Sequence, residues 1–217
     1  MTQTLLSLQV GKAQTIALES GDWRSAIHKK PVQTRLFLDV EGLTGDQQAN
    51  RKFHGGPDKA VCCFCEEHYA GLREFVGAGD EFSFGAFGEN FTVTGMTEEN
   101  VFLGDIYRVG SAVVQVSQPR QPCINLVRKW GHADIITHMT TQNTTGFYFR
   151  VLQTGEVEAG IPLELQERPL PDLSIVTLND AKYRKVGGIE MARRLSTTPE
   201  LSEEWTQNFR KRKGVLD

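Results

Sequence analysis

Residues 116–123 read Val-Ser-Gln-Pro-Arg-Gln-Pro-Cys, and this stretch decides how the rest of the chain is interpreted. It follows the β-branched run Ala112–Val116, whose composition predicts a strand. Each proline fixes its own φ angle and pushes the preceding residue into an extended conformation, so the loop is stiff. A stiff loop holds Cys123 in one place with the cation Arg120 nearby, and a neighbouring cation favours the thiolate that attacks substrates or binds metals. The alternative is a structural cysteine, because free cysteine is among the residue types most often buried.

Size and composition narrow the class of protein. A chain of 217 residues holds one core, or one medium domain with a small appendage. The net charge of −3 and a pI near 6.0 give no basic field, so we expect no nucleic-acid partner. The sequence contains no apolar run of the roughly 18 residues that a membrane helix needs, so we expect no membrane association. Four cysteines, three of them within residues 62–65, do not form a disulfide framework, and a reducing cytoplasm is expected.

The pattern of short apolar runs and turn residues predicts a protein that is mainly β with some α. The 21 glycines are typical of many tight turns between strands. Alternating apolar residues predict a single strand over 32–40, and continuous apolar periodicity predicts helices over 66–76 and 125–139. The further predicted strands are 5–17 with a break at Gly11, 60–65, 91–94, a hairpin over 105–116, 147–152, 155–157 and 163–165.

Two glycine-rich loops carry polar side chains that suit a binding site. Residues 54–60 read His-Gly-Gly-Pro-Asp-Lys-Ala, and residues 85–90 read Gly-Ala-Phe-Gly-Glu-Asn. Paired glycines allow close backbone approach, so their amides can face an anion or a flat ligand. Asn90 at a strand entrance can orient a ligand, or it can cap a turn as asparagine usually does. Each loop alone is equally typical of a plain glycine turn between strands.

The remaining cysteines and histidines are predicted to be structural. Cys62 and Cys65 have the spacing of half a zinc site, but no second pair exists, and the thiols fall in a predicted strand. We therefore expect them to pack inside the sheet. His68, His132 and His138 are expected to be exposed to solvent.

The composition changes after the stiff segment Arg168–Pro171. Ser174 and Ser202 are typical helix caps, and a further helix is predicted over 189–195. Acidic residues at the start of the last helix and basic residues at its end suit the helix dipole. This region is predicted to be a small three-helix appendage that is too short to be very stable alone.

Five motifs occur together in a fixed order: Gly42-Leu43-Thr44-Gly45-Asp46, residues 54–60, residues 85–90, Gly104-Asp105, and Gln118-Pro119-Arg120-Gln121-Pro122-Cys123. In this order they resemble the MOSC domain family, the module named after the C-terminal domain of molybdenum cofactor sulfurases. The resemblance extends to the YiiM-like branch, which carries a C-terminal 3-alpha domain, and so covers nearly the whole chain. It implies a β-barrel-like MOSC domain over residues 1–168 followed by a three-helix domain over residues 172–217. The thiols Cys63 and Cys65 depart from what is expected of relatives.

The resemblance also implies a chemistry. Relatives hold a molybdenum cofactor (molybdopterin) in a cleft, and the cysteine that matches Cys123 is a molybdenum ligand. They reduce small N-hydroxylated compounds such as hydroxylamino-purines and amidoximes to amines, with electrons from a separate redox protein and without pyridoxal phosphate. Because the pterin phosphate is an anion, the expected cofactor-binding residues are cations, backbone amides and one side-chain amide: Lys29, Lys59, Arg120, Gly55, Gly56 and Asn90. Cleavage of an N–O bond also requires protons, and the expected catalytic residues beside Cys123 are His54, Asp58, Glu89 and Asn90.

Three other functions remain open at this level. The same residues suit a carrier that transfers the cofactor, or a metal–sulfur species on Cys123, without turnover. Cys123 activated by His54 would suit acyl transfer, given a base in contact and an oxyanion hole. The C-terminal helices would suit a non-enzymatic interaction module. Substrate, electron donor and oligomeric state, including a possible homodimer, are not determined by the sequence.

Overall fold

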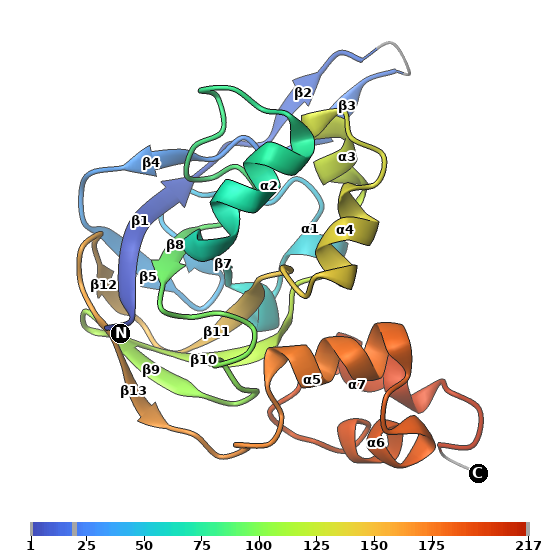
Figure 1. Ribbon diagram of the computed structural model, residues 1–217. Helices are drawn as coiled ribbons and strands as arrows, with labels where there is room; N and C mark the ends of the chain where they lie inside the picture. Colours follow the sequence, from blue (N-terminus) through green and yellow to red (C-terminus); the bar gives the residue numbers. More distant parts are fainter. Residues whose placement is uncertain (1, 19–20, 216–217) are drawn as a thin grey trace.

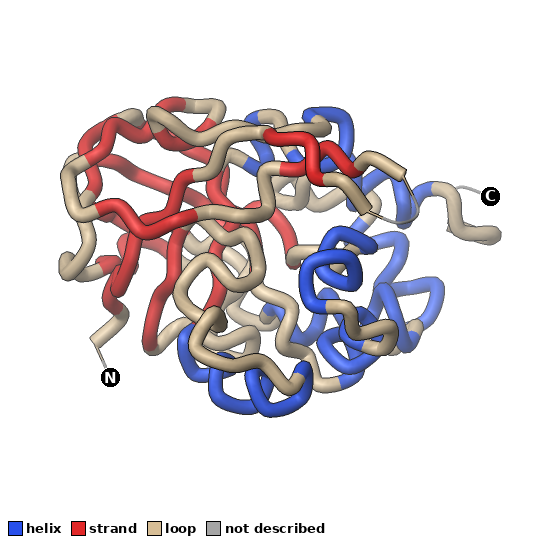
Figure 2. The backbone as a smooth tube through the Cα atoms, turned by 90° about the horizontal axis from the view of Figure 1, so that it is seen from above, coloured by secondary structure: helices blue, strands red, loops and turns tan. Residues whose placement is uncertain are grey.

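A computed structural model describes residues 2–18 and 21–215 of the 217-residue chain. Strands gather in one half of the molecule and most helices in the other (Figure 2). The main sheet has eight strands in the order β13-β9-β10-β11-β7-β8-β1-β4. Their bounds are β1 Thr4–Val10, β4 Lys30–Val32, β7 Val61–Cys65, β8 Phe91–Thr94, β9 Ile106–Val109, β10 Ala112–Pro119, β11 Phe147–Gln153 and β13 Leu163–Glu167.

This sheet curls until its two sides meet, which confirms the predicted barrel-like, β-rich fold. All neighbouring strands are antiparallel except the pair β7 and β8. Main-chain hydrogen bonds from Leu163 to the Gln3 carbonyl (2.9 Å) and from Leu5 to the Ile161 carbonyl (2.9 Å) join the segment entering β13 to β1. Two small sheets complete the β structure: β12 (Gly155–Val157) with β5 (Leu36–Asp39) and β6 (Gly42–Leu43), and β2 (Gln14–Ile16) with β3 (Trp23–Ser25).

Strand β7 lies inside the eight-stranded sheet, between β11 and β8, and this position explains why three cysteines occur close together in the sequence. All five of its residues are buried, as expected for a strand covered on both faces. Cys63 belongs to the barrel core with Phe91 and Phe147. Phe64 lies on the opposite face and stacks on Phe87, with 4.2 Å between ring centroids.

The second apolar cluster fills the space between the sheet and the helices above it (Figure 1). The helices are α2 (Tyr69–Val76), α3 (Ile124–Trp130) and α4 (Ile135–Thr141), and a short turn of helix, α1 (Arg51–His54), lies beside them. His132 and His138 are half-buried here, with ring centroids 4.4 Å and 3.7 Å from that of Phe75. The prediction that they are exposed was wrong, because a neighbouring aromatic ring covers them.

Two predicted elements are each divided in the structure. The alternating segment 32–40 is not one strand: β4 ends at Val32 and pairs with β1, whereas β5 begins at Leu36 and pairs with β12. The predicted helix over 125–139 is two helices, because Gly131 ends α3 in the left-handed region (φ 66°). In both cases the tertiary partners change within the segment, and part of the predicted apolar face is exposed: Val40 is 48% and Ile124 53% exposed.

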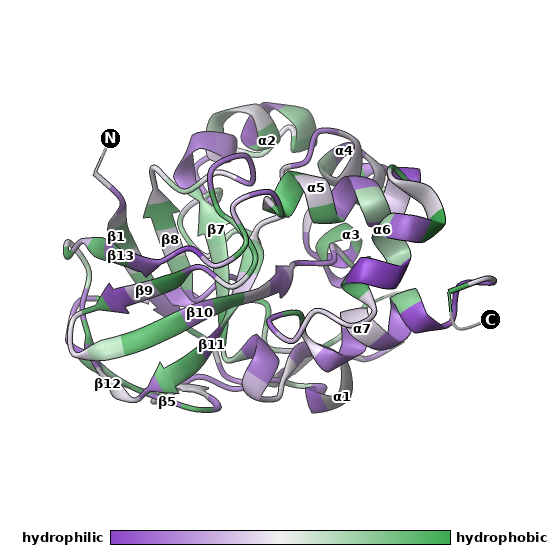
Figure 3. Ribbon diagram, turned by 90° about the horizontal axis from the view of Figure 1, so that it is seen from below, coloured by the Kyte–Doolittle hydropathy of each residue, from purple (hydrophilic) through white to green (hydrophobic). Residues whose placement is uncertain are grey.

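The C-terminal region forms α5 (Ile175–Asn179), a π-helical turn over Asp180–Arg184, α6 (Gly188–Leu195) and α7 (Glu203–Arg210). Ser174 and Ser202 cap α5 and α7 with their side chains, as predicted. The helices enclose an apolar cluster that contains Trp205 and also Leu103 from the barrel. Figure 3 shows hydrophilic residues on the outward surfaces of α6 and α7.

Several main-chain hydrogen bonds tie this region to the barrel. Leu103 donates to the Leu173 carbonyl (2.8 Å), and Ile175 donates to the Val101 carbonyl (2.9 Å) and is itself buried in the barrel core. The domain bounds 1–168 and 172–217 stay a prediction. In the part of the chain that the structure describes, no helix has both the length and the apolar character needed to cross a membrane.

Candidate active site

Four neighbouring strands place one polar side chain each at the same end of the barrel. Gln118 on β10 is the register partner of Tyr148 on β11, and Tyr148 is the partner of Cys62 on β7. Asn90, at the entrance to β8, accepts from the Cys62 amide with its Oδ1 (3.2 Å) and donates its own amide to the Cys62 carbonyl (2.7 Å). The row Gln118, Tyr148, Cys62 and Asn90 is therefore fixed by sheet register and borders a cleft.

The cleft has two connected parts that share eight lining residues: Arg24, Asn50, His54, Lys59, Gln121, Cys123, Asn125 and Tyr148. We name the first the Lys29 pocket, whose own lining includes Lys29, Asp46, Cys62, Phe87, Gly88, Asn90 and Arg120. We name the second the Trp23 pocket, whose own lining includes Trp23, Gln118, Pro122, Ile124, Arg128 and Glu204. The Lys29 pocket encloses about 90 Å³ and the Trp23 pocket about 420 Å³, so the cleft reaches the range of roughly 300–1,000 Å³ typical of small-molecule sites through the Trp23 pocket.

Cys123 lies where the two pockets join, and His54 is its polar neighbour. The thiol is a half-buried free cysteine at the start of α3, positioned by the stiff segment that follows β10. The Cys123 Sγ lies 3.5 Å from His54 Nε2. Burial, assisted by the nearby charges of Arg120 and Lys59, lowers the pKa of His54 below its ordinary value, so the imidazole is mostly neutral at neutral pH. A thiol and a neutral imidazole thus face the same space.

Arg120 brings a buried positive charge to this space. The residue is 6% exposed, its Nη2 donates to the Phe87 carbonyl, and its Nη1 has no hydrogen-bond partner among the described residues. The titratable groups within electrostatic reach include Cys62, Tyr148, Cys123 and the buried carboxylate of Glu89. Among the described residues, no carboxylate lies close enough to form an ion pair with Arg120. A buried cation without a carboxylate in contact is costly, so the arrangement favours an anionic ligand.

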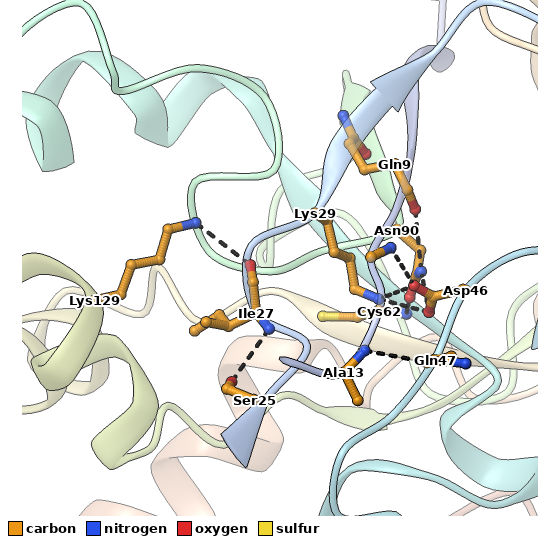
Figure 4. A network of polar contacts seen from close by, with 11 residues as sticks. Gln9, Ala13, Ser25, Ile27, Lys29, Asp46, Gln47, Cys62, Asn90 and Lys129 are labelled. Carbon is orange, nitrogen blue, oxygen red and sulfur yellow. Dashed lines mark hydrogen bonds and ion pairs between the residues drawn. The ribbon is translucent and has the colours of Figure 1, made fainter. Parts of the chain in front are cut away.

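Lys29 reaches the same pocket but has a carboxylate partner. It pairs with Asp46, and Asp46 Oδ2 also accepts from Asn90 Nδ2 at 2.8 Å (Figure 4). The Cys62 side chain lies beside this network, and burial raises the pKa of its thiol. Lys129 donates to the Gly85 carbonyl (2.9 Å), and burial lowers the pKa of Lys129 to about 8. The network fixes the walls of the Lys29 pocket.

Lys59 connects the cleft to the C-terminal helices. It is buried and pairs with Glu204, which stands in the first turn of α7. Gln121 also lines the cleft, and its amide accepts from Lys182 (2.6 Å) and Trp205 (2.9 Å) in the orientation that satisfies both donors. The last helix of the chain therefore forms part of the wall of this cleft.

Four of the predicted site residues do not line the cleft. Asp58 accepts from Arg150 Nε (2.9 Å) and from the Glu203 amide (3.2 Å), so its carboxylate joins the barrel to α7. Glu89 is fully buried and accepts from the Gly85 amide (2.6 Å) and the Phe87 amide (3.0 Å), so it organises its own loop. Gly55 and Gly56 form the tight turn after α1, and Gly56 has a positive φ of 92°.

The other predicted residues meet in the cleft: Cys123, His54, Lys29, Lys59, Arg120 and Asn90. Sequence reasoning missed Tyr148, Trp23 and Glu204, which lie outside the five motifs, and it gave no role to Asp46, which ends the first motif. It also assigned Cys62 to sheet packing alone, whereas the side chain borders the Lys29 pocket. A register prediction for β11 against β7 would have found Tyr148 and Cys62.

A comparison with family models matches the MOSC domain to residues 50–164, and the chain therefore belongs to the MOSC domain family. Within that family it is YiiM-like. The crystal structure of YiiM from Geobacillus stearothermophilus has a TM-score of 0.81 and 38% identity, covering 96% of this chain and 98% of that one. The uncharacterized protein YflK of Bacillus subtilis is 42% identical over 213 residues, covering 98% of this chain and 96% of YflK.

A more distant relative bears a name that describes an activity. A protein of Gibberella moniliformis named reductase is 35% identical over 176 residues. The match covers 80% of this chain and 31% of the reductase.

Proposed function

We propose that this protein is a molybdenum-cofactor-dependent reductase of N-hydroxylated compounds, with Cys123 as the protein ligand of the metal. The observation that carries the proposal is a half-buried thiol that shares a cleft with a buried arginine whose Nη1 has no partner among the residues that the structure describes. A buried guanidinium favours an anionic ligand, and a thiolate favours a soft metal ion. Membership in the MOSC family and the named reductase among its relatives support the same assignment.

The residues present fit a pterin cofactor that carries a phosphate. Arg120 Nη1 would donate to the anion, and Lys29 and Lys59 add positive charge to the same lining. Cys123 supplies the thiolate sulfur at the junction of the two pockets. When bound, the cofactor supplies the two-electron redox chemistry, and the protein contributes orientation and access.

The reaction consumes two electrons and two protons. The N–O bond of R–NHOH breaks, the nitrogen keeps its hydrogen and gains another to give R–NH₂, and the oxygen leaves as water. The electrons come from an external reduced flavin or iron–sulfur protein. His54, beside Cys123, would deliver protons to the departing oxygen. Burial raises the pKa of Tyr148, so its phenol keeps its proton and can donate a hydrogen bond to that oxygen.

The test is reduction of a hydroxylamino-purine under anaerobic conditions with a reduced viologen as electron source. Cofactor-loaded wild-type protein should contain molybdenum and produce the amine, whereas Cys123→Ser should be inactive because a hydroxyl cannot replace a thiolate on molybdenum. Cys63→Ser is the matched control, because that thiol is fully buried in the barrel core. Loaded wild-type protein that reduces no N-hydroxylated compound would refute the reductase and leave the carrier.

One observation favours a second candidate function, acyl transfer by a Cys–His pair. The 3.5 Å separation of Cys123 Sγ and His54 Nε2 is the arrangement that a nucleophilic thiol and its base require. This hypothesis predicts ester or amide hydrolysis by metal-free protein that is abolished by alkylation of Cys123. Absence of hydrolysis in protein whose thiol is titratable would exclude it.

A further inference from the structure

We infer that the Trp23 pocket recognises a nucleotide, so that the preferred substrate is an N-hydroxylated purine bearing a phosphate and not the free base. The inference rests on the proposed function for its chemistry but on a different pocket for its observations. Within the described residues, three features of that pocket carry it: an acceptor without a hydrogen-bond donor, an apolar wall and two cations without ion-pair partners.

The unpartnered acceptor is Gln118. Its side chain is 1% exposed, its Nε2 donates to the Pro119 carbonyl (3.1 Å), and its Oε1 accepts no hydrogen bond within the described residues. Gln118 lines the Trp23 pocket together with Cys123 and Tyr148. A buried acceptor without a donor is costly, and a ligand N–H would recover that cost. The exocyclic amino or hydroxylamino group of a purine carries such an N–H.

The apolar wall is formed by Trp23 with Pro122 and Ile124. Trp23 is 5% exposed, and its Nε1 donates to Asn125 Oδ1 at 3.0 Å, which holds the indole in one orientation. The Arg128 guanidinium lies over the Trp23 ring, so the indole, with Pro122 and Ile124, offers a planar ligand an apolar contact but no free ring face for stacking. The pocket encloses about 420 Å³ and is open to solvent, so it admits a base with its sugar and phosphate.

The cations are Arg24 on β3 and Arg128 on α3, both exposed and both in the pocket lining. Neither has an ion-pair partner anywhere in residues 2–18 and 21–215, and the Arg128 guanidinium lies 5.8 Å from the centre of the Trp23 ring. Lys59, in contrast, is paired with the carboxylate of Glu204 in the same lining. The positive charge of Arg24 and Arg128 lies beside the apolar wall, so a nucleotide whose base contacts that wall can place its phosphate against the two guanidinium groups. Arginine binds phosphate through two parallel N–H donors, which suits this position.

The test measures the binding of amine products, which the protein cannot reduce further, to cofactor-loaded protein. Adenine, adenosine and adenosine 5′-monophosphate are titrated while the intrinsic tryptophan fluorescence is followed. The monophosphate should bind at least tenfold more tightly than adenosine. Arg24→Ala and Arg128→Ala should each weaken the monophosphate about three- to tenfold and leave adenosine unchanged. Arg108→Ala is the matched control, an exposed arginine on β9 outside the cleft.

Gln118→Leu separates base recognition from phosphate recognition. It should weaken all three ligands by a similar factor of about ten, because it removes the acceptor for the base. Gln118→Glu keeps an acceptor but adds a negative charge, so it should weaken the monophosphate more than adenosine. In the assay of turnover, the hydroxylamino-purine 5′-monophosphate should have a higher kcat/KM than the free base, with the difference lost in Arg128→Ala.

The possible results test the nucleotide inference and the proposed function separately. Equal affinity for adenosine and its monophosphate overturns the nucleotide inference, even when the free base is reduced and the proposed function stands. Inorganic phosphate that competes as well as the monophosphate overturns it too, because the cations would then be a general anion site. Arginine-dependent nucleotide binding by loaded protein that reduces no N-hydroxylated compound supports the pocket and refutes the proposed function.

Discussion

Arg120→Met tests whether the buried arginine serves a ligand or the fold. Methionine keeps the length and apolar stem of the side chain but removes the charge and all donors. Within the described chain Arg120 Nη1 has no partner and no carboxylate contacts the guanidinium, so the substitution removes a buried charge that only Glu89 balances, at longer range. The matched control is Arg168→Met. Arg168 pairs with the fully buried Asp105 through Nε (2.9 Å) and Nη2 (2.8 Å).

The two substitutions should differ in their effect on stability. For Arg120→Met, removal of the hydrogen bond to the Phe87 carbonyl costs about 1.5–3 kcal/mol, and removal of the orphaned donor and buried charge returns a similar amount. The free energy of unfolding of the cofactor-free protein should therefore change by about 1 kcal/mol or less. Arg168→Met leaves the Asp105 carboxylate buried and unpaired, which costs about 3–5 kcal/mol and lowers Tm by roughly 6–20 °C in a chain of this size.

The two substitutions should affect cofactor retention in the opposite order, with the larger loss in Arg120→Met. Removing a charge-assisted hydrogen bond to the phosphate in a partly dry cleft costs about 1.5–3 kcal/mol, or about tenfold or more in affinity, so Arg120→Met should lose most of its molybdenum on gel filtration. Arg168→Met should retain molybdenum at temperatures where it is folded. The measurements are circular dichroism melting of the cofactor-free variants and elemental analysis of the loaded ones. Arg120→Met that melts as early as Arg168→Met, with an unchanged molybdenum content, would show that Arg120 is a structural residue.

His54→Gln should remove the pH dependence of turnover that comes from the imidazolium. Because the pKa of His54 is lowered, the kcat of the wild-type protein should rise as the pH falls from 8 towards 5.5. Equal pH profiles for the two proteins would exclude this role. His68 gives a pH dependence of stability instead. It is half-buried and lies 2.6 Å from the buried Glu98; burial opposes its charge, but the hydrogen bond and charge of Glu98 outweigh burial and raise the pKa of His68. This stabilisation is complete below the unfolded pKa of about 6.5 and is lost as the pH rises through the folded value, so urea unfolding from pH 6 to 9 should show a decline that His68→Gln lacks. Parallel curves would contradict it. Truncation after residue 168 should give a barrel with native-like near-ultraviolet circular dichroism but a lower Tm and little molybdenum, because the missing helices form one wall of the cleft; full cofactor retention would show that this wall is dispensable.

The sequence predicted those site residues whose position follows from the ends of strands. Arg120 and Cys123 follow β10, and Asn90 precedes β8, so barrel closure alone brings them to one end of the sheet. Asp58 and Glu89 lie in equally suggestive loops, yet their carboxylates accept from backbone amides and from Arg150 instead of facing the cleft. A residue pattern cannot distinguish these two orientations, because both satisfy the same hydrogen-bonding requirement.

The residues that the sequence did not predict come from elements that meet only in three dimensions. Trp23 belongs to a two-stranded sheet, and Tyr148 reaches the cleft through its register against Cys62. His68 was expected to be exposed because it begins an amphipathic helix. The structure brings Glu98, thirty positions further along the chain, against its ring. Non-local partners of this kind override local periodicity.

Glu204 shows why a change of composition is a poor guide to a change of function. The proline-rich segment at 168–171 suggested an appendage without site residues, and the secondary structure does change from strands to helices there. Yet Glu204 neutralises Lys59 in the cleft, and the adjacent Glu203 amide is capped by Asp58 from the second motif. An unbalanced Lys59 would add a further positive charge beside Arg120, and the cleft would then bind simple anions more tightly and less selectively. The C-terminal helices therefore set the charge of the cleft, and the β-barrel alone does not define the site.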